Sequence, residues 1–265
     1  MFKLVTWNIG SVRGPDGKTD LDRIIACLDR FCSFDMLCVQ EVSSGDSPDG
    51  EDQFALLRRQ LPGYAGFAAL ACDTLAGPGT EGRRRIGLMA FSRHPVLGAL
   101  RHSLPWPAAP DVTSMPRSAL ELTVAAPGGL LRVVTVHLER YARRQRLAQV
   151  ERLRELHREA SLHARCPPLP RHGPFAVAPR ALPALLAGDF NMLPGSPEHQ
   201  RLLAPFAGGM HPWRDCRQLA RPGRRLAPAG FDYVFASADL AGQLRRVRLD
   251  AGAERGPLMV ELDWS

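Results

Sequence analysis

Lysine is nearly absent from this chain. Lys3 and Lys18 are the only two, although lysine and arginine together number 34, so the formal net charge of +7 rests on arginine. Positive charge favours polyanionic partners such as nucleic acid, but arginine together with abundant alanine and proline is also typical of a GC-rich genome. Aromatic residues make up only 7% of the chain and are scattered. The sequence therefore contains no basic stripe interleaved with aromatic residues, which is the pattern that would indicate a single-stranded nucleic acid as the ligand.

Long apolar runs and paired cysteines are missing as well. No apolar stretch reaches the length that crosses a membrane. The first residues form no basic leader with a small-residue cleavage site, and the six cysteines form no CxxC pair and no metal-ligand spacing with histidine. We therefore expect reduced thiols in a cytoplasmic protein. With 265 residues, 45% of them hydrophobic, the chain can bury a large core, and we expect one domain over residues 1–265 and a monomer.

Strand-like and helix-like segments alternate along the chain. Short apolar runs bounded by turn residues predict strands, and apolar residues at helical spacing predict helices. The predicted strands are 2–8, 35–42, 85–92, 96–102, 117–125, 130–138, 182–190, 230–237, 243–250 and 257–264. The predicted helices are 21–31, 52–61 and 143–162, and residues 166–183, which contain six prolines, are predicted to be an irregular loop. This order is compatible with two sheets packed face to face and helices outside them.

One apolar run ends abruptly at polar residues. In LLAGDFN, residues 185–191, Phe190 alone separates Asp189 from Asn191. Side chains alternate between the two faces of a strand, so Asp189 and Asn191 are predicted to emerge together while Phe190 points into the interior. Loops after the carboxyl ends of buried strands are frequent ligand sites in α/β proteins. Asx residues also close turns, so a turn and a catalytic site both remain open here.

Four other predicted strands carry a polar residue at one end. Asn8, Glu41 and His137 end three of them, and Asp232 stands near the start of a late one. Each alone has an ordinary explanation, as a turn asparagine, a solvated carboxylate or a core histidine. Together they offer an oxygen ligand for Mg²⁺, neutral donors for phosphate oxygens, a proton acceptor and an imidazole donor.

These segments also carry a resemblance. TWN, QE, HLE, GDFN and FDYVF, in this order and at these separations, resemble the endonuclease/exonuclease/phosphatase superfamily of Mg²⁺-dependent phosphoesterases, from residue 3 to about residue 263. The resemblance implies an α/β fold, a four-layered α/β sandwich in which two packed mixed β-sheets are flanked by helices. It also implies a phosphate-ester substrate, with nucleic acid among the classes, and Mg²⁺ or Mn²⁺ as the cofactor.

The resemblance assigns a role to each matching residue. Glu41 would be the principal metal ligand, with Asn8 beside it contacting metal-bound water or phosphate. Asp189 would align or deprotonate the attacking water, and Asn191 would hold that water and the phosphate. His137 would donate to a phosphoryl oxygen as negative charge builds in the transition state.

The end of the chain departs from the family pattern. Asp232 would normally orient a histidine in a closing Ser-Asp-His motif before a proline, but Glu254 and Arg255 stand where the aspartate and histidine are expected, before Pro257. No histidine follows His211. Glutamate keeps an oxygen ligand for the metal site, whereas arginine keeps a positive charge and cannot act as a base.

Three hypotheses follow. In the first, the chain is an active Mg²⁺-dependent phosphoesterase in which Arg255 supplies the electrostatic part of the lost histidine. In the second, it is a catalytically impaired member that binds phosphate ligands or nucleic acid without efficient turnover. In the third, the fold serves protein interaction alone. Inward polar groups cost stability unless they are paired. The retention of four such groups therefore favours the first hypothesis over the third; they are Glu41, His137, Asp189 and Asn191.

Overall fold

Two six-stranded mixed sheets form the centre of the protein, as seen in a computed structural model that describes residues 1–10, 20–45, 51–78, 81–169, 173, 176, 178–220, 230–250 and 256–264. The first sheet has the order β11-β12-β1-β2-β4-β3. Its strands are β1 (Phe2–Asn8), β2 (Met36–Ser44), β3 (Ala65–Leu75), β4 (Arg83–Ser92), β11 (Leu244–Leu249) and β12 (Leu258–Leu262). The second sheet has the order β5-β6-β7-β8-β10-β9. Its strands are β5 (Val96–Leu104), β6 (Arg117–Ala126), β7 (Gly129–His137), β8 (Ala184–Asp189), β9 (Trp213–Asp215) and β10 (Asp232–Ser237).

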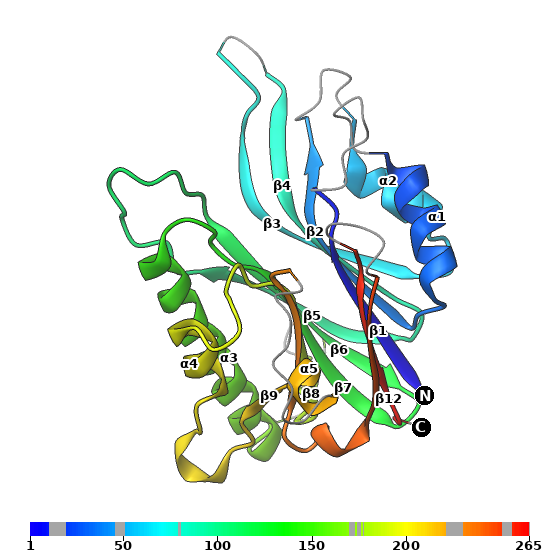
Figure 1. Ribbon diagram of the computed structural model, residues 1–265. Helices are drawn as coiled ribbons and strands as arrows, with labels where there is room; N and C mark the ends of the chain where they lie inside the picture. Colours follow the sequence, from blue (N-terminus) through cyan, green and yellow to red (C-terminus); the bar gives the residue numbers. More distant parts are fainter. Residues whose placement is uncertain are drawn as a thin grey trace.

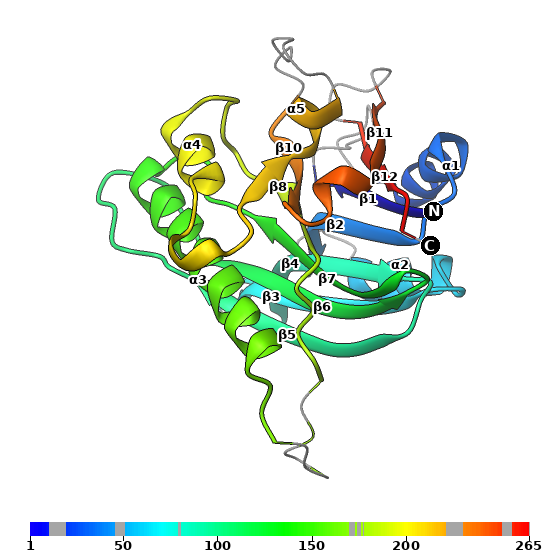
Figure 2. The ribbon, with the colours of Figure 1, turned by 90° about the horizontal axis from the view of Figure 1, so that it is seen from below.

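Helices cover the outer faces of both sheets (Figure 1). The five α-helices of the described ranges are α1 (Leu21–Phe31), α2 (Gln53–Gln60), α3 (Arg143–Arg165), α4 (Pro197–Leu203) and α5 (Cys216–Ala220), with 3₁₀ turns at Ala207–Gly209 and Ala241–Gln243. Helices α1 and α2 lie on the first sheet and α3 and α4 on the second, and the view from below shows the chain termini side by side (Figure 2). The predicted four-layered α/β sandwich is confirmed.

Most predicted elements are present, with ends shifted by a few residues. All ten predicted strands and all three predicted helices occur, and the helix predicted over 143–162 extends to Arg165. Strands β3 and β9 and helices α4 and α5 were missed. Strand β3 (AGFAALACDTL) is rich in alanine and largely exposed toward its end, so it lacks the bulky alternation that marks a strand. Between α3 and β8, the described residues contain no α-helix and no strand.

Three apolar layers follow from strand alternation. Residues such as Leu4, Leu122 and Leu185 fill the space between the two sheets. The opposite faces of the strands pack against the helices, with Ile24 of α1 buried against the first sheet and Leu153 of α3 buried against the second. The two sheets are therefore held together by side chains from one face of each.

Capping fixes where α1 begins, because the Asp20 side chain accepts a hydrogen bond from the Arg23 backbone N–H.

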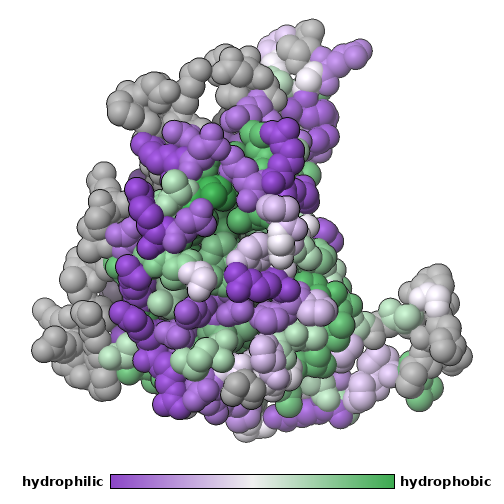
Figure 3. Space-filling view, turned by 90° about the vertical axis from the view of Figure 1, so that its right-hand side faces the viewer, coloured by the Kyte–Doolittle hydropathy of each residue, from purple (hydrophilic) through white to green (hydrophobic). Residues whose placement is uncertain are grey.

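The surface on the α1 side mixes hydrophilic and apolar residues (Figure 3). None of the helices in the described ranges is long and apolar enough to cross a membrane.

An ionic network is buried between the second sheet and α3. Glu121 on β6 accepts two hydrogen bonds of 2.8 Å from Arg180, lies 3.2 Å from the His102 ring and 4.0 Å from the Arg132 guanidinium. Burial alone would raise the pKa of Glu121, but these hydrogen bonds and charges hold that pKa at about 2. Breaking such a pair leaves an uncompensated buried charge, which typically costs about 3–5 kcal/mol. The network therefore fastens β5, β6 and β7 to the segment that follows α3.

His157 extends this network from α3. Its Nδ1 accepts from Arg132 at 2.6 Å, and its Nε2 lies 2.9 Å from the carbonyl oxygen of His211. The ring is therefore neutral, with its proton on Nε2. Burial and the neighbouring Arg132 charge lower the pKa of His157 to about 4.

The depressed pKa of His157 predicts acid destabilisation. Below pH 6.5 the unfolded chain binds a proton at this histidine while the folded protein does not until about pH 4, so folding stability is lost as the pH falls through this window. The loss is at most about 3 kcal/mol from this group. We expect His157→Gln to flatten the dependence of Tm on pH between 6.5 and 4, measured by calorimetry. His163→Gln, on the exposed side of the same helix, is the control. An unchanged slope in His157→Gln would show that another group carries the effect.

Candidate functional site

The carboxyl ends of four strands bring the predicted residues together. Strands β1 and β2 are parallel neighbours in the first sheet, and β7 and β8 are parallel neighbours in the second, where His137 pairs with Asp189. Parallel neighbours end at the same edge of a sheet. Polar residues that lie far apart in sequence therefore meet at one edge of the sandwich.

Asn8 connects the two sheets at this edge. Its side-chain Nδ2 donates to Glu41 Oε1 at 2.8 Å and to Asp189 Oδ2 at 2.9 Å, while its Oδ1 accepts from the Gly10 backbone N–H at 3.1 Å. The carboxamide has two N–H donors, and both are used on carboxylates from different sheets. Asn8 therefore fixes the relative position of Glu41 and Asp189.

A β-bulge presents Glu41 to the site. The register of β2 against β4 shifts between Gln40 and Val42, and Glu41, the extra residue, has φ 60°. A bulge re-aims a side chain that regular alternation would send to the other face. Gly10 leaves room for it, because a Cβ atom at Gly10 would lie 2.0 Å from Glu41 Oε2. The Glu41 side chain remains 30% exposed, so its carboxylate is accessible from solvent.

The GDFN segment forms both a turn and part of the site. Gly188 has φ 143°, and a Cβ there would lie 1.9 Å from the Val136 carbonyl oxygen, so only glycine fits. Asp189 Oδ1 accepts from the Asn191 backbone N–H at 2.9 Å, which closes an Asx turn around Asn191 at φ 47°. The other oxygen of Asp189 faces Asn8. A turn at this segment and a place for Asp189 in the candidate site, the two alternatives that the sequence left open, are therefore compatible with each other.

His137 lies against both carboxylates. Its Nε2 is 3.8 Å from Glu41 Oε1 and 3.7 Å from Asp189 Oδ2. Asn191 Nδ2, which donates to the Leu138 carbonyl oxygen at 2.9 Å, approaches the same ring nitrogen to 3.1 Å. Five of the predicted residues are thus within a few ångströms of one another.

Arg117 determines which nitrogen of His137 carries the proton. Its Nη1 lies 3.2 Å from His137 Nδ1, and a guanidinium can only donate. Nδ1 is therefore the acceptor, and a neutral ring carries its proton on Nε2, which faces Glu41 and Asp189. An imidazole cannot accept at both nitrogens, so the contacts from Arg117 and Asn191 compete for one acceptor. We assign that acceptor to Nδ1 because a hydrogen bond from a charged donor is the stronger of the two. His137 is thus oriented as a donor toward the carboxylates.

Glu139 holds Arg117 in place. It is fully buried, and its Oε2 lies 3.5 Å from Arg117 Nε while its Oε1 accepts from the Tyr141 backbone N–H at 2.8 Å. Sequence reasoning assigned no role to Arg117 or Glu139, although the HLE segment contains Glu139 and Arg117 opens a predicted strand. The signal was a charged residue at the edge of a predicted strand, with Arg117 at the start of one strand and Glu139 directly after another.

Of the three remaining predicted residues, the structure describes only Asp232. Asp232 is buried at the start of β10, and the register of β10 against β8 pairs it with Asp189. Glu254 and Arg255 lie outside the described residues.

The chemistry of the donors fits a small divalent cation. Within the described ranges, no group of three His, Cys, Asp or Glu side chains is arranged to hold a metal ion. Mg²⁺ needs only one or two protein carboxylates, because it keeps several waters and takes substrate oxygens. Glu41 and Asp189, joined through Asn8, provide such a pair, and the exposed part of Glu41 gives access.

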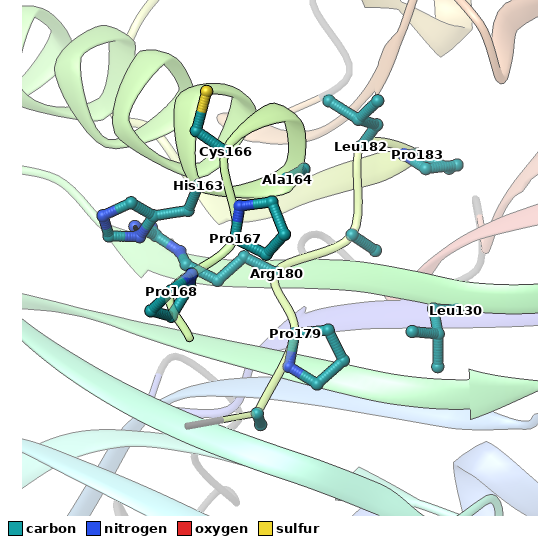
Figure 4. A pocket seen from close by; sticks show the side chains of 12 residues that line it. Leu130, His163, Ala164, Cys166, Pro167, Pro168, Pro179, Arg180, Leu182 and Pro183 are labelled. Carbon is teal, nitrogen blue, oxygen red and sulfur yellow. Dashed lines mark hydrogen bonds between the residues drawn. The ribbon is translucent and has the colours of Figure 1, made fainter. Parts of the chain in front are cut away.

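Two pockets differ in their relation to these residues. A narrow one is lined by Glu41, Arg117 and His137, together with the apolar side chains of Ala71, Ile86, Leu88 and Met115. A pocket of about 960 Å³ lies elsewhere, where the end of α3 meets the proline-rich segment, and its lining includes His163, Cys166 and Arg180 (Figure 4). None of the described residues that line the larger pocket carries a carboxylate, so the smaller pocket is the candidate for phosphate chemistry.

Known structures share this fold. A structure of an endonuclease/exonuclease/phosphatase from Beutenbergia cavernae is 24% identical, with a TM-score of 0.65 over 98% of this chain and 70% of that one. The human Nocturnin catalytic domain with bound sulfate is 17% identical, with a TM-score of 0.64 over 100% and 93%. A mannosyl-6-phosphatase from Bacteroides thetaiotaomicron is 14% identical, with a TM-score of 0.60 over 99% of each chain. Comparison with curated protein sequences gave no match.

The sequence itself matches one family over nearly its whole length. The match to the Endonuclease/Exonuclease/phosphatase family spans residues 5–254, which include Asn8, Glu41, His137, Asp189 and Asn191. The chain therefore belongs to the endonuclease/exonuclease/phosphatase family, whose members are phosphoester hydrolases that typically depend on a divalent metal ion.

Proposed function

We propose that this chain is a divalent-metal-dependent phosphoesterase that hydrolyses a phosphodiester or phosphomonoester by attack of water. The observation that carries the proposal is the Asn8 carboxamide, which joins Glu41 and Asp189 from different sheets beside the His137 ring. Buried polar groups cost stability unless they are paired. Their gathering at one solvent-accessible edge is therefore better explained by chemistry than by folding.

Three side chains divide the work of hydrolysis. Asp189, oriented by Asn8 and by the Asn191 backbone N–H, accepts the proton of the attacking water. His137, whose proton is on Nε2, donates a hydrogen bond to a phosphoryl oxygen. Arg117 keeps the ring in that tautomer and adds a positive charge that favours the developing negative charge of the transition state.

Glu41 is the residue that would hold Mg²⁺ or Mn²⁺, with Asp189 beside it. When bound, the ion would neutralise phosphate charge and polarise the phosphoryl group.

A binding module is the second candidate function. The replacement of the closing aspartate and histidine by Glu254 and Arg255 favours it, because Arg255 cannot exchange a proton. Such a protein would bind phosphate ligands or nucleic acid without efficient turnover.

Three further statements stay predictions: that the protein is a monomer, that residues 1–265 form one domain, and that the protein is cytoplasmic.

Replacing Asp189 tests the hydrolysis itself. Asp189→Asn keeps an oxygen acceptor for the turn but removes the proton acceptor, so we expect metal-dependent turnover to fall by ~10² or more with little change in Tm. The assay is a panel of phosphodiesters and phosphomonoesters with and without Mg²⁺ or Mn²⁺. Asp73→Asn, on the exposed end of β3, is the control. A variant that keeps both its fold and its metal-dependent turnover would contradict the catalytic role.

Replacing Glu41 tests the metal site. Glu41→Gln keeps the size of the side chain but removes the charge, so we expect the affinity for Mn²⁺ to fall at least ~10-fold, measured by electron paramagnetic resonance titration. Glu155→Gln, on the half-exposed outer side of α3, should bind as the wild type does. Equal affinity in wild type and Glu41→Gln would remove Glu41 from the metal site.

Restoring the closing motif separates the two candidate functions. We expect the double change Glu254→Asp with Arg255→His to raise metal-dependent turnover by ~10-fold or more, since an imidazole can exchange protons and an arginine cannot. Turnover equal in both proteins would show that the departure costs nothing. Binding of Mn²⁺ and inorganic phosphate with no turnover in either protein would establish the binding module instead.

A further inference from the structure

The candidate site is divided between two sheets that share no strand. Asn8 and Glu41 belong to the first sheet, and His137 and Asp189 belong to the second. In the described ranges, the strand pairing runs within each sheet. The distance and the register between the two halves of the site therefore depend on side chains.

The space between the sheets is filled mainly by apolar side chains, among them Leu4, Leu122 and Leu185. Apolar contacts are favourable but have no direction, so they oppose separation of the sheets more than sliding. Hydrogen bonds are directional and weaken steeply when donor and acceptor move apart. A polar contact across this space is therefore suited to fixing one register.

Gln40 makes such a contact. It is fully buried, and its side-chain Nε2 lies 3.2 Å from Thr6 Oγ1 and 3.2 Å from Thr135 Oγ1. Thr6 stands on β1 in the same sheet as Gln40, whereas Thr135 stands on β7 in the other. Each of the two N–H donors of one carboxamide thus binds a hydroxyl on a different sheet.

This contact lies directly beneath the site. Side chains two residues apart on a strand share a face, so Thr6 lies next to Asn8 and Thr135 next to His137 on the inner faces of their strands. Gln40 immediately precedes Glu41 at the bulge. The hydrogen bond between Gln40 and Thr135 is therefore one residue layer below the contacts that Asn8 and Glu41 make with the second sheet.

We propose that Gln40 is a positioning residue, whose hydrogen bond to Thr135 fixes the register of the two sheets and so sets the gap in which Glu41 faces His137 and Asp189. A misplacement of about 1 Å in such a site can cost ~10²-fold in rate. The kinetic consequence rests on the proposed phosphoesterase function, whereas the geometric consequence does not.

Two isosteric variants distinguish a positioning role for Gln40 from hydrogen bonds that only pair its buried side-chain amide. Thr135→Val removes the acceptor on the second sheet, and Thr6→Val removes the acceptor on the first, at nearly equal burial. Both leave one Gln40 N–H without its partner, so we expect a similar drop in Tm. Thr135→Ser keeps the hydroxyl and should restore wild-type behaviour.

The first readout is hydrogen exchange of the Asn8 side-chain amide, measured by NMR, because its protons bridge the sheets to Asp189. We expect exchange to be ~10-fold or more faster in Thr135→Val and unchanged in Thr6→Val and Thr135→Ser. If each substitution disturbed only its own strand, exchange of the Asn8 amide would instead be faster in Thr6→Val, because Thr6 is on the same strand as Asn8. The second readout is affinity for Mn²⁺ and turnover, which should fall in Thr135→Val alone.

Equal exchange in the two valine variants, or faster exchange in Thr6→Val, would overturn the proposal. If Thr135→Val does not fold, Gln40→Met is compared with Thr6→Val by the same exchange measurement, where faster exchange supports the role and unchanged exchange contradicts it. If the wild type binds no Mn²⁺ and hydrolyses no ester, the proposed function fails, while the exchange rates still decide the role of Gln40.

Discussion

The hydrogen bonds that Asn8 donates to Glu41 and Asp189 are the contacts on which the candidate site depends. Two carboxylates that approach each other repel. A neutral amide with two N–H groups can satisfy both without adding a charge. Because Glu41 and Asp189 belong to different sheets, the arrangement exists only while the sandwich keeps its spacing. Gly10, which orients the amide oxygen and leaves room for Glu41, belongs to the same requirement.

The second sheet is constrained on both of its faces near the site. On the inner face Thr135 contacts Gln40, and on the outer face Glu121 on β6 and Arg132 on β7 join the ionic network under α3. The same two strands carry Arg117 and His137. Buried ion pairs contribute little net stability, but they are costly to break. The network therefore restricts how β6 and β7 can move, and this preserves the contact between Arg117 and His137.

Strand alternation was sufficient to predict part of the site but not all of it. It placed Asp189 on the same face as Leu185 and Ala187 of β8, whereas Asn191 lies beyond the strand and is held by the turn that Asp189 closes. Alternation along β2 would send Glu41 to the face opposite Gln40, and only the bulge turns its side chain toward Asn8. A bulge depends on how β2 pairs with β4, which no local pattern contains. Arg117 was missed for a similar reason, since its contact with His137 crosses from β6 to β7.

The contact between Arg117 and His137 also bears on the departure at the end of the chain. A guanidinium at Nδ1 leaves the ring its proton on Nε2. In the proposed mechanism His137 therefore donates from Nε2, and a second proton could bind only at Nδ1, where it would place a cation beside Arg117. Arginine at position 255 cannot accept a proton either. In the proposed mechanism, proton acceptance is therefore left to a carboxylate. Among the described residues that meet at this edge, Asp189 is the carboxylate whose two oxygens are oriented by Asn8 and Asn191, so the proposed hydrolysis depends on that residue.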